Sequence, residues 1–391
     1  MDKFQKLTDF LLYLRAQGTP SVDCAVMQNG KCIYRFMDGC SDAEGTVPLD
    51  GKERYSIYSC SKPITVTALL QLYEKGAFRL DEPVSRYLPE FAEMTVQTED
   101  GLRKAENPIT IRNLFTMTAG LSYNLHSPML EKAREETGGR CPTRETMQYL
   151  AQEPLLFEPG TCWKYSLCHD VLAALLEVLT GEKFADYVQK NIFDPLDMRD
   201  STFRTAAHPE NLGLCAKYRF KDGVHQPIGP EIAYNLGTEY ASGGAGCVST
   251  VEDYLRFLEA LRVGDVILKR QTVDLMTSAQ VADCVIPLEN FSYRPEYGYG
   301  LGVRCPQIGK AAQDFGWGGA AGAYLAVDRT RNYSLFYVQH VLSSPVQKLR
   351  SNVRRILLEC LDEEKQNPAV YGENVIRTAG ACDGEARPET F

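Results

Sequence analysis

The sequence predicts a mixed α/β (α+β) fold: one antiparallel sheet, flanked by the first and last helices, joined to a mostly helical second lobe. Two strand-like runs flank the dipeptide Asn29-Gly30, which is typical of a β-hairpin. Strand patterns return only from about Tyr297, and the long stretch between is mainly helical in pattern. Because both ends of the chain supply strands, we expect them to share one sheet.

The N-terminal elements follow from short patterns. Residues 3–17 are amphipathic and end before a Gly and a Pro, which predicts a helix. Residues 22–27 and 31–36 are the two strands of the hairpin. We expect residues 54–58 to form a further short strand that leads directly to Ser59.

The stretch from Ser59 to about Arg262 is predicted to be mainly helical. Its helices are marked by residues that cap and end helices. The expected elements are a short helix from Leu80 to near Pro89, a helix over 111–118 capped by Thr110 and closed by Gly120, a helix capped by Ser166 and ended by Gly181, and a helix opened by a capping box at Ser249-Thr250-Val251-Glu252. We expect residues 242–246 to be a flexible glycine-rich loop that lines a cleft.

The C-terminal part returns to strands and closes with a helix. The expected strands are residues 300–303, 314–317, 323–327 and 333–338. A final helix is expected over about 346–360, and the polar residues 362–391 are expected to be loosely held.

These elements suggest two lobes. Residues 1–58 and 290–391 would form the sheet lobe, and residues 59–289 would form the mainly helical lobe. We expect the active site in the cleft between them.

Composition limits the classes of function. With 44% hydrophobic and 24% charged residues among 391, the chain resembles ordinary soluble globular proteins. The net charge of -9 argues against nucleic acid and anionic membranes as main partners. No apolar run approaches the roughly 20 residues of a membrane span, and the N-terminus lacks the apolar segment of a signal peptide.

The 13 cysteines are scattered, and no two have C-x-x-C spacing. This pattern argues against a zinc cage or a disulfide framework and favours reduced thiols in a cytoplasmic protein. A pair brought together by folding remains open. The sequence has no phosphate loop, dinucleotide fingerprint or metal-ligand spacing, so we expect neither a cofactor nor a metal.

The motif Ser59-Cys60-Ser61-Lys62 lies where a helix begins. Residues three apart share a helix face, so Lys62 can point at the Ser59 hydroxyl. The positive end of the helix and any burial lower the pKa of the lysine towards a value useful for a general base. This arrangement would activate a serine without a catalytic histidine. The alternative is a capping serine beside a solvated lysine.

Two further segments are candidates for the same site. Tyr165 could act as a general base or acid, although taken alone it is more simply explained as a core tyrosine beside Trp163. Trp317-Gly318-Gly319-Ala320 lies at an expected strand edge, where the glycines would let the backbone approach a ligand. A backbone N–H there, together with that of Ser59, could form an oxyanion hole. The alternative is a tight turn.

The histidines carry no recognisable catalytic motif, although a Ser-His-Asp arrangement remains open. His169 and Asp170 follow Tyr165 closely and could touch the site. More simply, they stabilise the first turn of a helix, with Asp170 favourably placed at the positive end of the dipole.

Taken together, the order of these motifs resembles the serine β-lactamase and penicillin-binding-protein-like superfamily, above all its class C β-lactamase-related branch with its esterases and D-stereospecific peptidases. The likeness extends from about Val22 to Leu358. It includes residues 80–89 (LDEPVSRYLP), 116–121 (TMTAGL), 157–160 (FEPG) and 242–246 (SGGAG).

The resemblance implies a β-lactamase/transpeptidase-like fold and an acyl-enzyme mechanism. Ser59 would attack a carbonyl, and Lys62 and Tyr165 would share the proton transfers. The N–H groups of Ser59 and Ala320 would hold the oxyanion, with Trp317, Gly318 and Gly319 beside the substrate.

Two departures from the family pattern bear on the substrate. The second motif is commonly Tyr-x-Asn but here reads Tyr165-Ser166-Leu167, and the third is commonly Lys-Thr-Gly but here reads Trp317-Gly318-Gly319. Losing the amide and the cation should weaken recognition of anionic β-lactams and peptides. We therefore expect a carboxylesterase that acts on small esters, with weak or no β-lactamase activity.

Several alternatives keep the fold. They are a D-amino-acid peptidase or amidase, an acyltransferase, and a non-catalytic acyl-binding or penicillin-binding module. The expected partner is a small-molecule ester or amide. The loops Ser122–Cys141, Arg219–Tyr240 and Leu288–Tyr297 would shape specificity, and the oligomeric state stays open.

Overall fold

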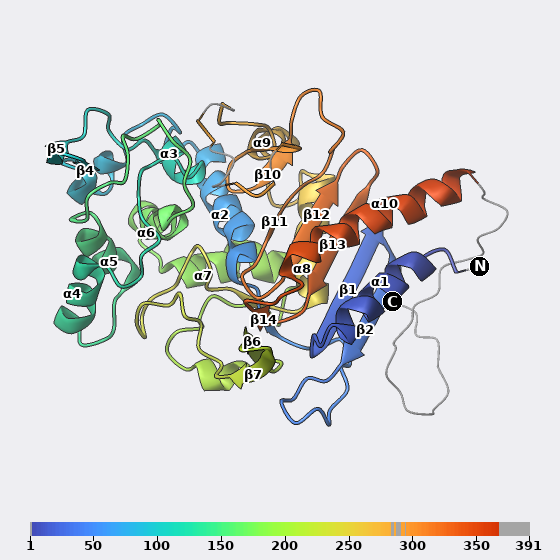
Figure 1. The fold of residues 1–391 in the computed structure, drawn as a ribbon. Helices are drawn as coiled ribbons and strands as arrows, with labels where there is room; N and C mark the ends of the chain where they lie inside the picture. The colour runs from blue at the N-terminus through green and yellow to red at the C-terminus, as the bar shows by residue number, and fades with distance from the viewer. Residues whose placement is uncertain (1, 283–284, 287–290, 294, 367–391) are drawn as a thin grey trace.

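A seven-stranded antiparallel sheet built from both ends of the chain is the centre of the fold (Figure 1). The computed structural model describes residues 2–282, 285–286, 291–293 and 295–366. The strand order is β2-β1-β13-β12-β11-β10-β9. These strands are β1 (Ser21–Gln28), β2 (Lys31–Gly39), β9 (Tyr297–Tyr299), β10 (Arg304–Pro306), β11 (Phe315–Gly318), β12 (Tyr324–Asp328) and β13 (Tyr333–Val338). The predicted α/β class is confirmed.

The described residues contain ten α-helices, most of which lie away from the sheet (Figure 1). They are α1 (Gln5–Ala16), α2 (Lys62–Glu74), α3 (Ile111–Phe115), α4 (Pro128–Glu136), α5 (Thr143–Leu150), α6 (Cys168–Thr180), α7 (Phe184–Val188), α8 (Val251–Val263), α9 (Arg270–Met276) and α10 (Ser351–Gln366). Short strands accompany them: β3 (Tyr55–Ser56), β4 (Thr95–Thr98), β5 (Gly101–Lys104), β6 (Lys217–Lys221), β7 (Val224–Ile228), β8 (Val248–Ser249) and β14 (Val341–Leu342).

The two faces of the sheet bury different cores because successive strand residues point to opposite sides. On β12, Tyr324 and Ala326 pack with α1 and α10, whereas Leu325 and Val327 join the core shared with the helices of the middle of the chain. The first and last helices therefore cover one face, as the sequence predicted, and α8 packs against the other (Figure 1). The hairpin turn Asn29-Gly30 has positive φ at both residues, as expected.

The middle of the chain contains more strand than predicted. β4 pairs with β5, and β6 pairs with β7, as two antiparallel hairpins. The residues of β5 and β7 are mostly exposed, so these strands lack the apolar alternation that identifies a strand. The dipeptide Asp222-Gly223 is typical of a hairpin turn and could have predicted the second hairpin. Its two residues have φ of 51° and 80°. The segment Ser122–Cys141, treated as a loop, contains α4.

Several predicted boundaries and caps were wrong. The short helix expected after Leu80 is two 3-10 turns, Val84–Arg86 and Pro89–Phe91. The helix capped by Thr110 ends at Phe115, before Met117 takes a positive φ of 59°. Ser166 caps nothing, since its hydroxyl contacts the Cys168 thiol instead.

The remaining differences lie towards the C-terminus. Thr250, rather than Ser249, caps α8 by accepting the Asp253 N–H. Residues 300–303 connect β9 and β10 instead of forming a strand. Helix α10 begins later than predicted and continues to Gln366, so residues 362–366 are helical, and the rest of the predicted tail lies outside the described residues.

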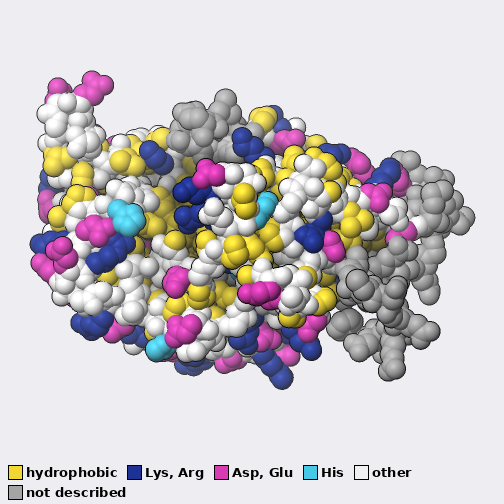
Figure 2. Space-filling view, turned by 60° about the horizontal axis from the view of Figure 1, so that its bottom comes forward, with side chains coloured by type: hydrophobic (Ala, Val, Ile, Leu, Met, Phe, Trp, Pro, Cys, Tyr) yellow, Lys and Arg dark blue, Asp and Glu magenta, His cyan; other side chains and the backbone are white. Residues whose placement is uncertain are grey.

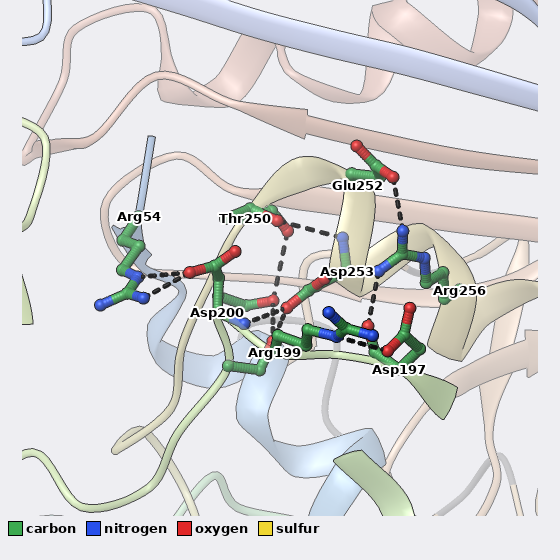
Figure 3. A network of polar contacts seen from close by, with 10 residues as sticks. Arg54, Asp197, Arg199, Asp200, Thr250, Glu252, Asp253 and Arg256 are labelled. Atoms are coloured by element: carbon green, nitrogen blue, oxygen red, sulfur yellow. Dashed lines mark hydrogen bonds and ion pairs between the residues drawn. The ribbon is translucent and has the colours of Figure 1, made fainter. Parts of the chain in front are cut away.

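A polar network holds the start of α8 against the strand that leads to Ser59 (Figure 3). The Asp253 carboxylate accepts hydrogen bonds from the Asp200 N–H at 2.8 Å and from Arg256 at 3.0 Å. Asp200 in turn forms an ion pair with Arg54, which immediately precedes β3. Because β3 pairs with β8, these contacts help to fix the backbone that enters the Ser59 segment.

The surface carries both signs of charge. Figure 2 shows the face with the β6–β7 hairpin, where apolar side chains gather near the middle and Lys, Arg, Asp and Glu are interspersed around them. None of the helices in the described part of the chain is long and apolar enough to cross a membrane. Every cysteine that the structure describes is a free thiol.

A buried ion cluster supports the sheet behind β11. Asp314 is fully buried and contacts Arg304 at 2.9 Å and Arg354 at 2.5 Å, and it accepts a hydrogen bond from Tyr297 at 2.8 Å. The Arg304 guanidinium also lies 5.1 Å from the Tyr324 ring centroid. Removing the one carboxylate would leave two cations facing each other without water.

We therefore expect Asp314→Ala to lower the free energy of unfolding by about 3–5 kcal/mol, the usual cost of breaking a buried pair. Urea denaturation followed by circular dichroism would measure it. The control is Glu363→Ala, which removes an exposed ion pair with Lys6 and should change the stability by less than about 1 kcal/mol. Equal effects of the two substitutions would contradict this role of the cluster.

Candidate active site

Ser59 lies in a 3-10 turn, Tyr58–Ser61, that runs directly into α2. The preceding residue, Tyr58, is buried and takes a positive φ of 48°, a conformation that costs energy for a large side chain. The Ser61 hydroxyl donates to the Tyr58 carbonyl at 2.5 Å and accepts the Cys247 N–H at 2.9 Å. The turn that presents the serine is therefore held from the inside by a buried hydroxyl.

Lys62 points at the Ser59 hydroxyl, as its spacing predicted. Its Nζ lies 3.3 Å from Ser59 Oγ and donates to the Gly244 carbonyl at 2.7 Å. The side chain is fully buried, so the alternative of a solvated lysine is excluded. The Nζ also lies 4.4 Å from the centroid of the Tyr165 ring.

Burial lowers the pKa of Lys62 to about 7, and the nearby Asp170 carboxylate acts in the opposite direction. An amine with this pKa is largely neutral just above pH 7 and can accept the serine proton. Since an ordinary lysine stays charged to pH 10, the enclosure of this side chain gives it the chemistry of a base.

The segment 242–246 is buried and hydrogen bonded, not the flexible cleft lining that the sequence suggested. A β-carbon on Gly244 would lie 2.7 Å from Asp170 Oδ2 and 3.3 Å from Lys62 Nζ. A β-carbon on Gly243 would lie 2.3 Å from the His169 carbonyl oxygen. The glycines are therefore needed for close approach of this backbone to the lysine.

Tyr165 completes the group around the serine. Its phenol lies close enough to the Ser59 hydroxyl for that contact to lower its pKa, although burial raises the pKa overall. The Trp317 indole N–H donates to the Tyr165 hydroxyl at 3.3 Å, and the two rings stack with centroids 5.8 Å apart. Tyr165 is thus held by Trp317, one of the residues expected beside the substrate.

The end of β11 faces the serine across the site. A β-carbon on Gly319 would lie 2.3 Å from the carbonyl oxygen of Ile57, two residues before Ser59. The Gly319 N–H donates to the Ala323 carbonyl at 2.8 Å. In the part of the chain that the structure describes, no acceptor pairs with the Ala320 N–H. That group is therefore available to a ligand, as the oxyanion hypothesis requires.

His169 and Asp170 lie behind the site and do not line its pocket. Burial and the nearby Lys62 lower the pKa of His169 well below its usual value, so the ring is neutral. Asp170 lies in the first turn of α6, as expected, and accepts hydrogen bonds from Ser242 at 2.7 Å and Tyr240 at 3.1 Å. Its carboxylate ties α6 to the glycine segment that contacts Lys62.

A pocket of about 390 Å³ opens onto Ser59. Aromatic rings dominate its walls, and Arg350 is the one cation among the lining residues that the structure describes. The lining residues are Ser59, Tyr123, Trp163, Tyr165, Tyr234, Phe291, Ser292, Tyr293, Trp317, Gly318, Gly319, Ala320, Gln347 and Arg350. The predicted residues Ser59, Tyr165 and 317–320 meet here.

The three loops expected to shape specificity supply Tyr123, Tyr234 and residues 291–293 of the wall, although the sequence did not single out these residues. Tyr123 stacks on Tyr165 with the rings 3° from parallel, and Tyr234 packs edge-on against Tyr123. Because the chain has 21 tyrosines, the sequence does not distinguish those that line the pocket from the others. Arg350 carried no signal either, because it follows the sheet and lies far from the motifs in sequence.

Leu167, which replaces the family's asparagine, is buried in the core at the start of α6 and does not line the pocket. Trp317, which replaces the lysine, contributes an indole to the pocket wall. Neither position offers a charged or amide group to a substrate.

Comparison with known proteins identifies the family. The family model described as Beta-lactamase matches residues 3–358. The chain belongs to the Beta-lactamase family. Two curated relatives cover most of it: esterase EstB of Burkholderia gladioli, 32% identical over 82% of this chain and 86% of the relative, and acyltransferase calJ of Penicillium decumbens, 30% identical over 79% and 81%.

A solved structure agrees. The chain is similar to EstCE1, described as a hydrolase with promiscuous acyltransferase activity, with a TM-score of 0.73 and 27% identity over 90% of this chain and 98% of that one. The superfamily inferred from the sequence is confirmed, and so is the assignment to serine hydrolases. The roles of the individual site residues remain predictions.

The buried lysine should make stability depend on pH. In the unfolded chain its pKa is near 10.5, against about 7 when folded, so the unfolded state binds the extra proton between these values. Wild-type stability should therefore rise by up to about 1.4 kcal/mol for each pH unit across this window.

Lys62→Met keeps the volume but cannot be protonated, so its stability relative to wild type should be highest at pH 7 and decline towards pH 10. Thermal unfolding at several pH values would measure this. Lys132→Met, at an exposed position on α4, is the control and should show no such trend. A difference between Lys62→Met and wild type that stays constant with pH would mean that the lysine is not buried as described.

Proposed function

We propose that this protein is a carboxylesterase that hydrolyses small esters through an acyl-enzyme on Ser59. The observation that carries the proposal is the contact of one hydroxyl with the Lys62 amine, at 3.3 Å, and the Tyr165 phenol at the base of an aromatic pocket. The name of the curated relative EstB supports ester hydrolysis as the reaction.

In the proposed reaction, the Ser59 oxygen attacks the ester carbonyl while its proton passes to neutral Lys62. The Ser59 and Ala320 N–H groups hold the resulting oxyanion. Collapse of the tetrahedral intermediate expels the alcohol, which takes up the proton through Lys62 or Tyr165. A water then attacks the acyl-enzyme by the same route and releases the carboxylic acid. Every proton has a nearby carrier, and no cofactor is required.

The pocket favours neutral esters over β-lactams. Its walls are mostly aromatic rings, and the positions of the family's lysine and asparagine hold Trp317 and the core residue Leu167. A β-lactam or peptide carboxylate would lose charge-assisted partners that contribute about 1.5–3 kcal/mol each.

We expect the purified protein to hydrolyse p-nitrophenyl acetate and butyrate with a kcat/KM at least about 10- to 100-fold above that for nitrocefin, in keeping with the loss of one such partner. Ser59→Ala should abolish ester hydrolysis and labelling by a fluorophosphonate probe, as detected by intact mass. Efficient opening of nitrocefin with neglect of both esters would overturn the substrate order. A wild-type protein that takes up no probe would favour a non-catalytic binding module.

Activity should rise with pH through about 7, because hydrolysis needs the neutral form of Lys62. A pH profile of kcat/KM for p-nitrophenyl acetate would locate this limb. Asp170→Asn removes a negative charge that raises the lysine pKa, so the limb should move to lower pH. A limb that stays in place in this variant would show that the Asp170 carboxyl is not the charged group acting on Lys62.

Acyl transfer is the second candidate, favoured by the name of calJ and the description of EstCE1. The apolar, aromatic walls could hold an acceptor alcohol in place of water. Adding a primary alcohol or amine to the ester assay and measuring the ester or amide formed against free acid would separate transfer from hydrolysis. Turnover of D-alanyl peptides would instead indicate the peptidase alternative.

We propose a cytoplasmic location, because the cysteines in the described part of the chain form no disulfide. The proposed partner is a small-molecule ester or amide. The division into a sheet lobe, residues 1–58 and 290–391, and a helical lobe, residues 59–289, is likewise proposed, with Ser59 in the cleft between them.

A further inference from the structure

Arg350 stands apart among the residues of the pocket wall. It lies just before α10, and its half-buried guanidinium faces the end of β11. In the part of the chain that the structure describes, no carboxylate lies within ion-pair distance of it. Its Nη1 instead donates to the Gly319 carbonyl oxygen at 2.7 Å. A cation directed at a backbone carbonyl beside the nucleophile calls for a physical reason.

The Gly319 carbonyl and the Ala320 N–H belong to the same peptide group. In a trans peptide these two groups point in opposite directions, so whatever holds the carbonyl also aims the N–H. The carbonyl accepts two hydrogen bonds, from Arg350 at 2.7 Å and from the Gly322 N–H at 3.1 Å. Because both donors hold the carbonyl, they also fix the opposite Ala320 N–H, which has no acceptor among the described residues and belongs to a residue that lines the pocket with Ser59.

The contact has an electrostatic effect as well. A hydrogen bond from a charged donor is stronger than a neutral one, and hydrogen bonds in series polarise each other in a poorly solvated site. A guanidinium on the carbonyl oxygen draws electron density from the peptide and makes its N–H a better donor. That gain is largest when the N–H faces a full negative charge, as it would in the tetrahedral intermediate.

The residues beside the contact between Arg350 and Gly319 leave room for it. A β-carbon on Gly318 would lie 2.6 Å from the Arg350 Cζ and 2.7 Å from its Nη2, so only glycine lets the guanidinium lie across this strand end. The second glycine, Gly319, is needed for contact with the Ile57 carbonyl that precedes the serine. The Gly-Gly pair thus admits the arginine on one side and the Ser59 segment on the other.

We propose that Arg350 is a positioning residue for the oxyanion hole, which orients and polarises the Gly319–Ala320 peptide. The inference rests on the proposed function, since it concerns the same acyl-enzyme chemistry at Ser59. It assigns this cation to the transition state of any neutral ester, rather than to an anionic group on the substrate.

The test compares Arg350→Met, which keeps the aliphatic stem without donors, with Arg350→Lys, which keeps the charge on a single donor nitrogen. With p-nitrophenyl acetate, Arg350→Met should lower kcat by about 10- to 100-fold with little change in KM, somewhat less than the loss of a whole oxyanion donor. Arg350→Lys should recover part of that loss. Gly318→Ala should lower kcat in the same direction, because the new methyl group displaces the guanidinium.

A second readout separates this role from a merely structural one. Phenylboronic acid forms a tetrahedral adduct with an active serine, and its inhibition constant does not depend on the fraction of folded enzyme. That constant should rise in Arg350→Met by about the same factor as kcat falls. Arg355→Met, which removes an exposed arginine on the following helix α10, is the control and should leave kcat and the boronate constant unchanged.

Three results would overturn the proposal. The first is wild-type kcat and boronate affinity in Arg350→Met. The second is a loss confined to the KM of esters that carry a carboxylate, which would make Arg350 a substrate-binding cation. The third is a protein whose Ser59 neither hydrolyses esters nor reacts with a fluorophosphonate, in which case the proposed function itself fails. If Ser59 is labelled without ester turnover, the labelling rates of the same variants still decide the role of Arg350.

Discussion

The enclosure of one lysine is the constraint on which the site depends. Lys62 is fully buried beside a half-buried serine, and that burial lowers its pKa to about 7. Burying an ammonium group is costly, so the surrounding chain must exclude water and still supply a partner. The Gly244 carbonyl supplies it at 2.7 Å, which is possible only because the segment carries no side chain there. Residues 242–246, which the sequence suggests are a flexible loop, therefore help to hold the lysine that would act as the base.

Much of the fold could be predicted because it follows from local patterns. The Asn29-Gly30 hairpin and the apolar runs of β12 and β13 identify the sheet, and its two covering helices are amphipathic. The hairpins β4–β5 and β6–β7 were missed because exposed strands carry no alternation to detect. The cap at Thr110 was predicted correctly and the cap at Thr250 was missed by one residue, whereas Ser166 caps nothing because its hydroxyl contacts the Cys168 thiol.

The site divides in the same way. Ser59 and Lys62 could be paired from sequence because three residues on a helix set their geometry. Tyr165 and the 317–320 segment required the family pattern, since their approach to the serine is a tertiary event. The loops that carry the wall tyrosines were expected to shape specificity, but the individual tyrosines and Arg350 could not be identified, because common residue types at distant positions give no local signal. The same tertiary packing places a different cation, Arg350, in the pocket wall, on the Gly319 carbonyl.

These positions suggest a division of labour between the two ends of the chain and its middle. The middle supplies the nucleophile, the base and Tyr165, all on or beside helices that are buried together. The C-terminal sheet strands supply the backbone N–H that would bind the oxyanion. It lies in the turn after β11, which contacts the Ile57 carbonyl on one side and Arg350 on the other. Because the Ile57 carbonyl and the Ser59 hydroxyl are two residues apart, the turn cannot shift without changing its distance to the nucleophile. The contact between Gly319 and the Ile57 carbonyl thus links proton transfer to charge stabilisation. It explains why Gly319 must be glycine, and the adjacent arginine explains the same of Gly318.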